Sequence, residues 1–298
     1  MLYAFDGTWN RDHPGTERDS NVRLFADACQ VPHHYARGVG TRFGRLGAVV
    51  GGITGLGARG RVARALATFE RRLEQGDTNI DVIGFSRGAA LALHFANQVW
   101  FLAQQRKLHL PIRFLGLWDT VPSFGIPGND LNLGWDLDVP DSVQRCAHAM
   151  ALDERRKTFP LWRPALHLKD VKEKKRLTEV WFRGVHSDVG GGNRKPGLSS
   201  ITLGWMFAQA EAAGLPFTPR LKTWNRRRMD PSAPISTSWY DLIIDPKRPA
   251  LPGDRVHHTV RYRPREGRRR DHNNPPEGLL RVDNQGRTVG VFRWPAGA

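Results

Sequence analysis

The pentapeptide Gly-Phe-Ser-Arg-Gly at positions 84–88 is the first group of residues with a spacing that could do chemistry. In a tight turn between a strand and a helix, this pattern lifts the serine hydroxyl clear of the sheet, and the glycines stand where a Cβ would collide. The pattern therefore predicts Ser86 as a nucleophile, with the backbone amide of Arg87 as an oxyanion donor at a helix N-terminus. The alternative is a glycine-rich turn with a buried capping serine.

A serine hydroxyl is a weak nucleophile unless a base takes its proton. His186 follows an apolar run at 179–185 and opens a glycine-rich loop, so we expect it to be this base. His257 and His258 are the alternatives, because a base late in the chain also suits the order Ser, Asp, His.

A carboxylate must orient the base. Asp119 follows the apolar run 112–118 and lies between the serine and the histidine in sequence, so we expect it to be the acid. Asp188 is the alternative. No cofactor is expected for such a mechanism, but Asp6 and Asp188, with Asp119, form an alternative oxygen-ligand set for a divalent cation such as Ca²⁺.

The exit of the first apolar run, residues 2–5, offers further backbone donors. These enzymes take their second oxyanion donor from a loop after an earlier strand. Gly7 or Thr8 would supply it here. The alternative is a hydrogen-bonded turn centred on Asp6 that only begins the fold.

Strand-like and helix-like patterns alternate along the first two thirds of the chain, and three strand-like runs end in candidate site residues. The alternation predicts an α/β fold of the α/β-hydrolase type, with a mostly parallel central sheet and helices on both faces. We expect a catalytic core over residues 1–215. Residues 216–298 are rich in proline and arginine and are expected to form an extension packed on the same domain.

Composition bounds the partners of this 298-residue chain. Its formal charge of +16 indicates anionic partners, and the basic residues gather late in the chain. Two cysteines exclude a disulfide scaffold and favour a reducing compartment. Neither a signal peptide nor an apolar run of about 20 residues is present, which predicts a cytoplasmic location in the producing cell.

Five ordered blocks together resemble the DUF2235 family of α/β-hydrolases, which includes the Tle1-type phospholipase effectors of type VI secretion. The blocks are Phe5 to Asn10, Gly38 to Thr41, Gly84 to Ala89, Gly116 to Val121 and Gly184 to Gly192, with a weaker match at Val256 to Tyr262. Because they follow the family's order, they are far more specific than a single pentapeptide.

The resemblance implies a serine esterase that acts on lipids, with Ser86, Asp119 and His186 at the positions of the family's serine, aspartate and histidine blocks. Phospholipid acyl esters are the implied substrates. It also implies an antibacterial effector that a secretion system delivers without a signal peptide, with a component of that system or an immunity protein as partner.

A different class of function is a non-catalytic module on the same fold that binds anionic membrane or nucleic acid through the basic C-terminal third. The arginine-rich stretch at 265–270 lacks interleaved aromatic residues and a recognisable binding module, so nucleic acid is not expected as a partner. Basic residues also suit an enzyme that makes peripheral contact with an anionic membrane.

Overall fold

The computed structural model describes residues 1–7, 19–38, 55–122, 134–168, 175–236, 248–262 and 273–295. Its strands are β1 (Leu2–Phe5), β2 (His33–Ala36), β3 (Ile80–Phe85), β4 (Ile112–Trp118), β5 (Cys146–Ala151), β6 (Leu177–Phe182), β7 (Arg255–His257), β8 (Leu280–Val282) and β9 (Thr288–Val291). Within these residues they form one nine-stranded sheet in the order β2-β1-β3-β4-β5-β6-β7-β8-β9. Every neighbouring pair is parallel except β8 and β9.

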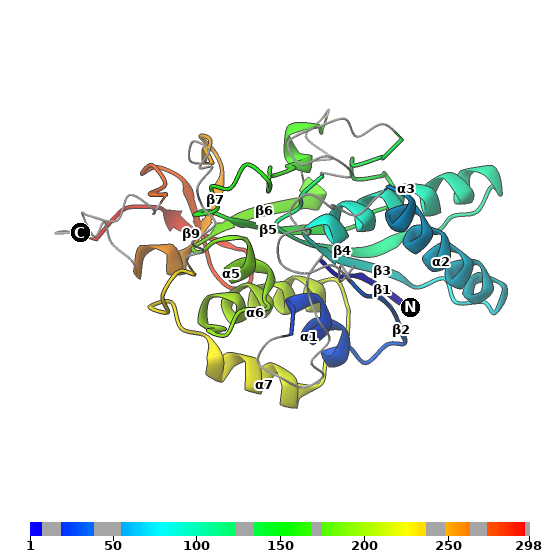
Figure 1. Ribbon diagram of the computed structural model, residues 1–298, viewed down its shortest axis with the longest axis horizontal. Helices are drawn as coiled ribbons and strands as arrows, with labels where there is room; N and C mark the ends of the chain where they lie inside the picture. Colours follow the sequence, from blue (N-terminus) through cyan, green and yellow to red (C-terminus); the bar gives the residue numbers. More distant parts are fainter. Residues whose placement is uncertain are drawn as a thin grey trace.

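Helices cover both faces of this sheet. They are α1 (Asn21–Ala28), α2 (Gly55–Glu74), α3 (Arg87–Gln105), α5 (His186–Gly190), α6 (Gly197–Ala212) and α7 (Pro219–Arg228), with short 3₁₀ helices at Pro164–Leu166 and His258–Tyr262. Figure 1 shows α2 and α3 on one side of the strands and α1, α6 and α7 on the other.

The two faces arise from the alternation of side chains along each strand. In β1, Tyr3 and Phe5 pack into the apolar cluster beneath α2 and α3, whereas Leu2 and Ala4 pack into the cluster beneath α1 and α6. All four are buried, as expected for a strand covered by helices on both faces.

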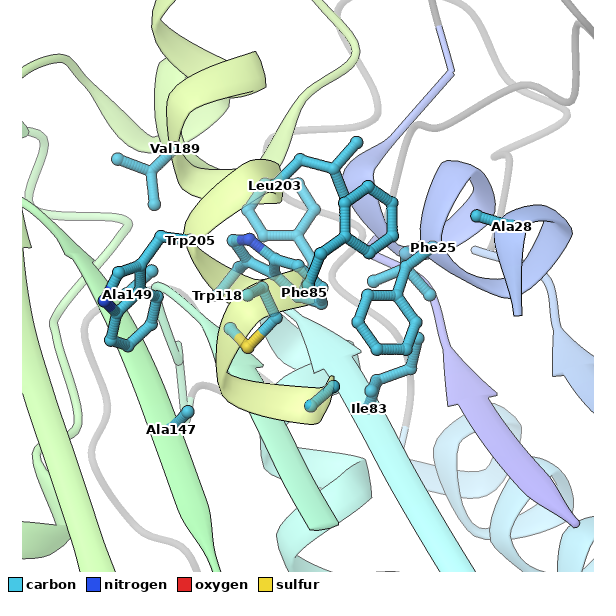
Figure 2. Packing of buried hydrophobic residues seen from close by; sticks show 14 of the residues in the cluster. Phe25, Ala28, Ile83, Phe85, Trp118, Ala147, Ala149, Val189, Leu203 and Trp205 are labelled. Carbon is cyan, nitrogen blue, oxygen red and sulfur yellow. The ribbon is translucent and has the colours of Figure 1, made fainter. Parts of the chain in front are cut away.

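The cluster on the α6 side is built from aromatic side chains of several elements. Figure 2 shows Phe25 of α1, Phe85 of β3 and Trp118 of β4 around Leu203 and Trp205 of α6. Phe25 and Trp118 meet edge to face, with ring centroids 5.9 Å apart. This packing fixes the ends of β3 and β4, the two strands that precede the first two candidate site residues.

The predicted fold class is confirmed: the sheet is mostly parallel and helices lie on both faces. Strands β7 to β9 come from the part that we expected to be an extension, yet they continue the sheet of β1 to β6. The division of the chain at residue 215 stays a prediction. None of the helices in the described ranges is long and apolar enough to span a membrane.

Candidate active site

Ser86 lies at the turn between β3 and α3 in a conformation that L-residues rarely adopt, with φ 60° and ψ −130°. The turn is tight because its glycines touch backbone. A Cβ on Gly84 would lie 2.5 Å from the Gly88 carbonyl oxygen, and a Cβ on Gly88 would lie 2.2 Å from the Phe5 carbonyl oxygen. The sequence pattern of the pentapeptide is therefore a steric requirement here, and the turn stores backbone strain at the serine.

Asp119 and His186 are brought together by the parallel sheet. Asp119 directly follows β4, the neighbour of β3, and its backbone is also left-handed, with φ 41°. His186 opens α5, a few residues after β6. The His186 Nδ1 atom lies 2.6 Å from Asp119 Oδ2. Because a carboxylate can only accept, Nδ1 carries the proton and Nε2 is left as the basic nitrogen.

Aromatic rings hold the imidazole of His186 in place. The ring of Phe85, the residue before Ser86, lies with its centroid 4.6 Å from that of His186, and the ring of Phe159 lies at 4.7 Å. The Phe85 contact puts the imidazole beside the serine turn. Burial lowers the pKa of His186 below its ordinary value, against the opposing effect of Asp119 and Glu154.

The carboxylate of Asp119 is completely buried and bonded on both oxygens. Besides His186, it accepts a hydrogen bond from the Ala151 amide at 2.8 Å and one from Arg248 Nη1 at 2.7 Å. Burial opposes its ionisation, but the charge of Arg248 and the hydrogen bond of His186 outweigh burial and hold the pKa of Asp119 well below its usual range. The residue is therefore a carboxylate at neutral pH.

Glu154 is a second buried carboxylate beside the imidazole. Its Oε2 accepts from the His186 backbone amide at 3.1 Å and from Arg156 Nη2 at 2.6 Å. Burial again opposes ionisation, yet the Arg156 hydrogen bonds and charge lower the pKa of Glu154 to about 2. The sequence patterns singled out neither Glu154 nor Arg248. Glu154 does come three residues after the apolar run of β5, which is the signal that could have found it, whereas Arg248 follows no such run.

The candidate oxyanion donors differ in availability. Arg87 is the first residue of α3, and the Ser86 carbonyl receives its helical hydrogen bonds from Ala89 and Ala90, so the Arg87 amide precedes the bonded turn. Gly7 is near the serine, since a Cβ on it would lie 3.2 Å from Ser86 Cβ. Its amide, however, donates to Asp6 Oδ1 at 2.7 Å. Thr8 lies outside the described residues.

The three carboxylates that we weighed as cation ligands all accept hydrogen bonds from protein donors, and those of Asp119 are described above. Asp6 Oδ2 accepts from Ser20 Oγ at 2.6 Å and from the Tyr35 hydroxyl. Asp188 accepts from Asn193 Nδ2 at 2.6 Å and from both the amide and the hydroxyl of Ser236. Asp188 thus links the loop of Asn193 to the segment of Ser236. The carboxylate that contacts His186 Nδ1 is that of Asp119, and not that of Asp188. Across the described parts of the chain, no three His, Cys, Asp or Glu side chains are grouped to hold a metal.

The alternative bases lie in the C-terminal strands. His257 is completely buried on β7, with Nδ1 2.8 Å from Thr259 Oγ1 and Nε2 3.0 Å from Asn284 Oδ1. Burial lowers its pKa to about 3, and the ring of His258 lies tilted against it, with the ring centroids 4.4 Å apart. Both nitrogens of His257 are thus engaged by neutral partners, which is typical of a structural histidine. The structure pairs His186, and not His257, with a carboxylate.

Comparison with known proteins places the chain in a family. The family of Tle1-like phospholipase effectors of the type VI secretion system, catalytic domain, has a model that matches residues 1–99 and 96–209. The chain belongs to this family. The resemblance predicted from the sequence blocks is confirmed.

A solved structure shows the same fold at low sequence identity. The chain is similar to an uncharacterized protein from Pseudomonas aeruginosa, with a TM-score of 0.54 and 22% identity over 76% of this chain and 50% of that one. It is also similar, with a TM-score of 0.44 and 22% identity, to the Tle1 effector solved bound to the VgrG spike of the type VI secretion system, over 64% of this chain and 50% of that one.

A curated relative is much longer than the matched segment. An uncharacterized protein of Saccharomyces cerevisiae is 46% identical over 48 residues, which are 14% of this chain and 7% of the yeast protein. The chain therefore spans about half of each solved relative and a small part of the curated one.

Proposed function

We propose that this chain is a serine esterase that hydrolyses acyl esters of phospholipids, with Ser86, His186 and Asp119 as its catalytic residues. The observation that carries the proposal is the 2.6 Å contact between His186 Nδ1 and Asp119 Oδ2 beside the strained turn of Ser86. Membership in a family of phospholipase effectors supports the choice of ester. Membership in this family also suggests that a type VI secretion system delivers the protein. Its partner would then be a component of that system or an immunity protein.

The chemistry follows from where the protons sit. His186 Nε2 accepts the hydroxyl proton of Ser86 while the serine oxygen bonds to the acyl carbon, and the carbonyl electrons move to its oxygen. The Arg87 amide stabilises this oxyanion. When the carbonyl re-forms, the bond to the alcohol breaks and His186 returns the proton to the leaving oxygen. Water then releases the acid from the acyl-serine by the same two steps.

The electrostatics of the site suit this cycle. Burial keeps the pKa of His186 low, so the imidazole is neutral and basic at pH 7. Asp119 stays ionised and stabilises the imidazolium that forms during each step. The site thus holds a base and a fixed negative charge without any metal ion in the mechanism.

Helix α7 supports an anionic membrane as the surface on which the enzyme works. Arg226 and Arg227 are exposed in its last turn, and no acidic residue interrupts the helix. A cavity of about 400 Å³ opens between α1, α6 and α7, with Phe207, Arg220 and Trp224 in its lining. Cations next to an amphipathic aromatic residue are typical of peripheral membrane contacts.

The proposal is tested by labelling with a fluorophosphonate probe and by release of fatty acid from phospholipid vesicles. Wild type should label and release fatty acid, whereas Ser86→Ala should do neither. Asp119→Asn should lower kcat by about 10⁴-fold, because the amide favours the wrong imidazole tautomer. Ser199→Ala removes another buried serine, on α6, and should behave as wild type.

Equal labelling of wild type and Ser86→Ala would refute the serine mechanism. Salt-dependent vesicle binding without labelling or hydrolysis would favour the non-catalytic binding module instead.

A further inference from the structure

Arg248 reaches the candidate site from beyond the residues that the family model covers, which end at 209. Its side chain is 10% exposed, and its guanidinium makes three contacts. Nη1 donates to Asp119 Oδ1 at 2.7 Å and to the Ala151 carbonyl at 2.9 Å, and Nη2 donates to the Phe159 carbonyl at 2.8 Å. One planar cation therefore joins three separate segments of the core.

Two of these contacts bear on the imidazole of His186. Asp119 turns one oxygen to His186 and the other to Arg248, so the arginine fixes the rotation of the carboxylate. The Phe159 carbonyl accepts a hydrogen bond from Arg248, while the Phe159 ring packs on His186. Arg248 thus constrains the His186 imidazole in two ways: Asp119 holds its Nδ1 atom, and the Phe159 ring packs against it.

Arg248 is itself held in place. Its backbone carbonyl accepts from Asn273 Nδ2 at 2.6 Å, and the same amide group donates to the Leu152 carbonyl at 2.9 Å. The Asn273 backbone amide donates to Asp153 Oδ1 at 2.8 Å. The arginine is therefore supported by the segment that follows β5, next to Glu154.

A second chain of contacts ties the residue after Asp119 to the same part of the protein. The Thr120 amide donates to His148 Nε2 at 3.2 Å, and His148 Nδ1 lies 3.1 Å from Glu179 Oε1. Arg163 then bridges Glu179 at 3.0 Å and Asp254 at 2.7 Å. Residues 248 and 254 thus both anchor the loop that begins at Asp119.

We propose that Arg248 is a positioning residue of the reaction, which holds the Asp119 carboxylate and the Phe159 backbone where they orient His186. This inference rests on the proposed function, because it assigns a role within that catalytic site. Arg248 acts through its neighbours, because its guanidinium contacts are with Asp119, Ala151 and Phe159.

The charge of Arg248 gives the proposal a signature that a purely structural role lacks. The charged groups that act on His186 are the carboxylates of Asp119 and Glu154 and the guanidinium of Arg156, and Arg248 acts in turn on both carboxylates. Removing the Arg248 cation leaves the Asp119 charge uncompensated, so protonation of His186 becomes easier. The acidic limb of the rate profile should then move to higher pH.

The test compares Arg248→Met, Arg248→Lys and a matched control on the full chain. The control is Arg113→Met, which breaks a bidentate ion pair with the buried Asp81, with N–O distances of 2.6 and 2.9 Å. This pair lies near the N-terminal ends of β3 and β4, away from Ser86 and Asp119. We would measure kcat, KM and the pH profile of ester hydrolysis. NMR titration of His186 follows its protonation independently of activity.

For Arg248→Met we expect kcat to fall by about 100-fold with KM unchanged, and the acidic limb to rise by about one pH unit. Arg248→Lys keeps the positive charge but loses the planar set of guanidinium donors. We therefore expect kcat to fall about 10-fold while the acidic limb of the pH profile stays at its wild-type pH. Arg113→Met should keep the wild-type kcat and limb.

A folded Arg248→Met protein with the kcat and limb of wild type would overturn the proposal. If that variant does not fold, Arg248→Lys decides: a wild-type kcat overturns the proposal, and a reduced kcat with an unmoved limb supports it. If Ser86→Ala remains active, the proposed function fails, while the His186 titration still shows whether Arg248 governs that histidine.

Discussion

Replacing Ser86 by glycine should make the protein more stable while it removes the proposed nucleophile. The reason is the backbone at this position, with φ 60° and ψ −130°, which disfavours any residue with a Cβ. Ser86→Ala is the proper reference, because it also lacks the hydroxyl but keeps the Cβ. The comparison therefore isolates the backbone strain from the loss of the side-chain oxygen.

The size of the effect follows from two opposing quantities. Strain of this kind costs about 1–3 kcal/mol, and glycine would relieve it. Glycine also gains freedom in the unfolded chain, which costs about 0.5–1 kcal/mol. We expect Ser86→Gly to exceed Ser86→Ala in free energy of unfolding by about 1 kcal/mol. For a chain of this length, that corresponds to a rise in Tm of about 2 °C.

Urea unfolding measures this difference, provided that both variants give the same m-value. Lys107 offers a matched control, because it is an exposed residue after α3 with φ 54°. Lys107→Gly should also be more stable than Lys107→Ala, but it should keep fluorophosphonate labelling. A gain at Lys107 together with no gain at Ser86 would show that the serine turn stores no strain.

Two further predictions concern charge. Glu154→Gln should be less stable than wild type by about 3 kcal/mol at pH 7, because the pKa of Glu154 lies at about 2 in the folded protein and near 4.5 when unfolded. A depressed folded pKa stabilises above the unfolded value, so the difference between the two proteins should shrink as pH falls from about 5 to 2, as followed by urea unfolding. Arg226→Glu with Arg227→Glu should weaken sedimentation with phosphatidylglycerol vesicles at least 10-fold, since each cation near an anionic surface contributes about 1 kcal/mol.

Each of these two predictions has a control that distinguishes the named residues from a change in overall stability or net charge. A Glu154→Gln difference that stays constant from pH 5 to pH 2 would contradict the assignment of a charged Glu154. For the vesicles, Arg64→Glu with Arg71→Glu makes the same change of net charge on exposed positions of α2. Equal weakening by both pairs would show that net charge, and not helix α7, governs vesicle binding.

The residues that could be predicted from the sequence are those whose position follows from strand ends. Ser86 and Asp119 each come directly after a buried apolar run, and parallel neighbours put such residues at one edge of the sheet. The glycines around the serine could be predicted because a Cβ there would meet backbone. The pairing of His186 with Asp119 follows from the same edge, although their catalytic roles stay predictions.

Arg248 and Phe159 could not have been found this way. Arg248 is one of 45 Lys and Arg residues and follows no apolar run, so nothing local distinguishes it. Its partner, Asp119, lies 129 positions away in the chain, so the contact is a long-range property of the fold. Asp6 and Asp188 illustrate the opposite case: their positions suggested a cation, but neighbouring hydroxyl and amide donors satisfy their oxygens.

The pairing of Asp119 with Arg248 joins residues that are 129 positions apart in the chain. Contacts over such separations are costly to close, because the entropy lost on loop closure grows with the length of the intervening chain. During synthesis, the serine turn and α3 are made well before residue 248 leaves the ribosome. The arrangement around Asp119 is therefore completed only when the C-terminal strands have docked, so a partly made chain carries its serine without a fully held acid.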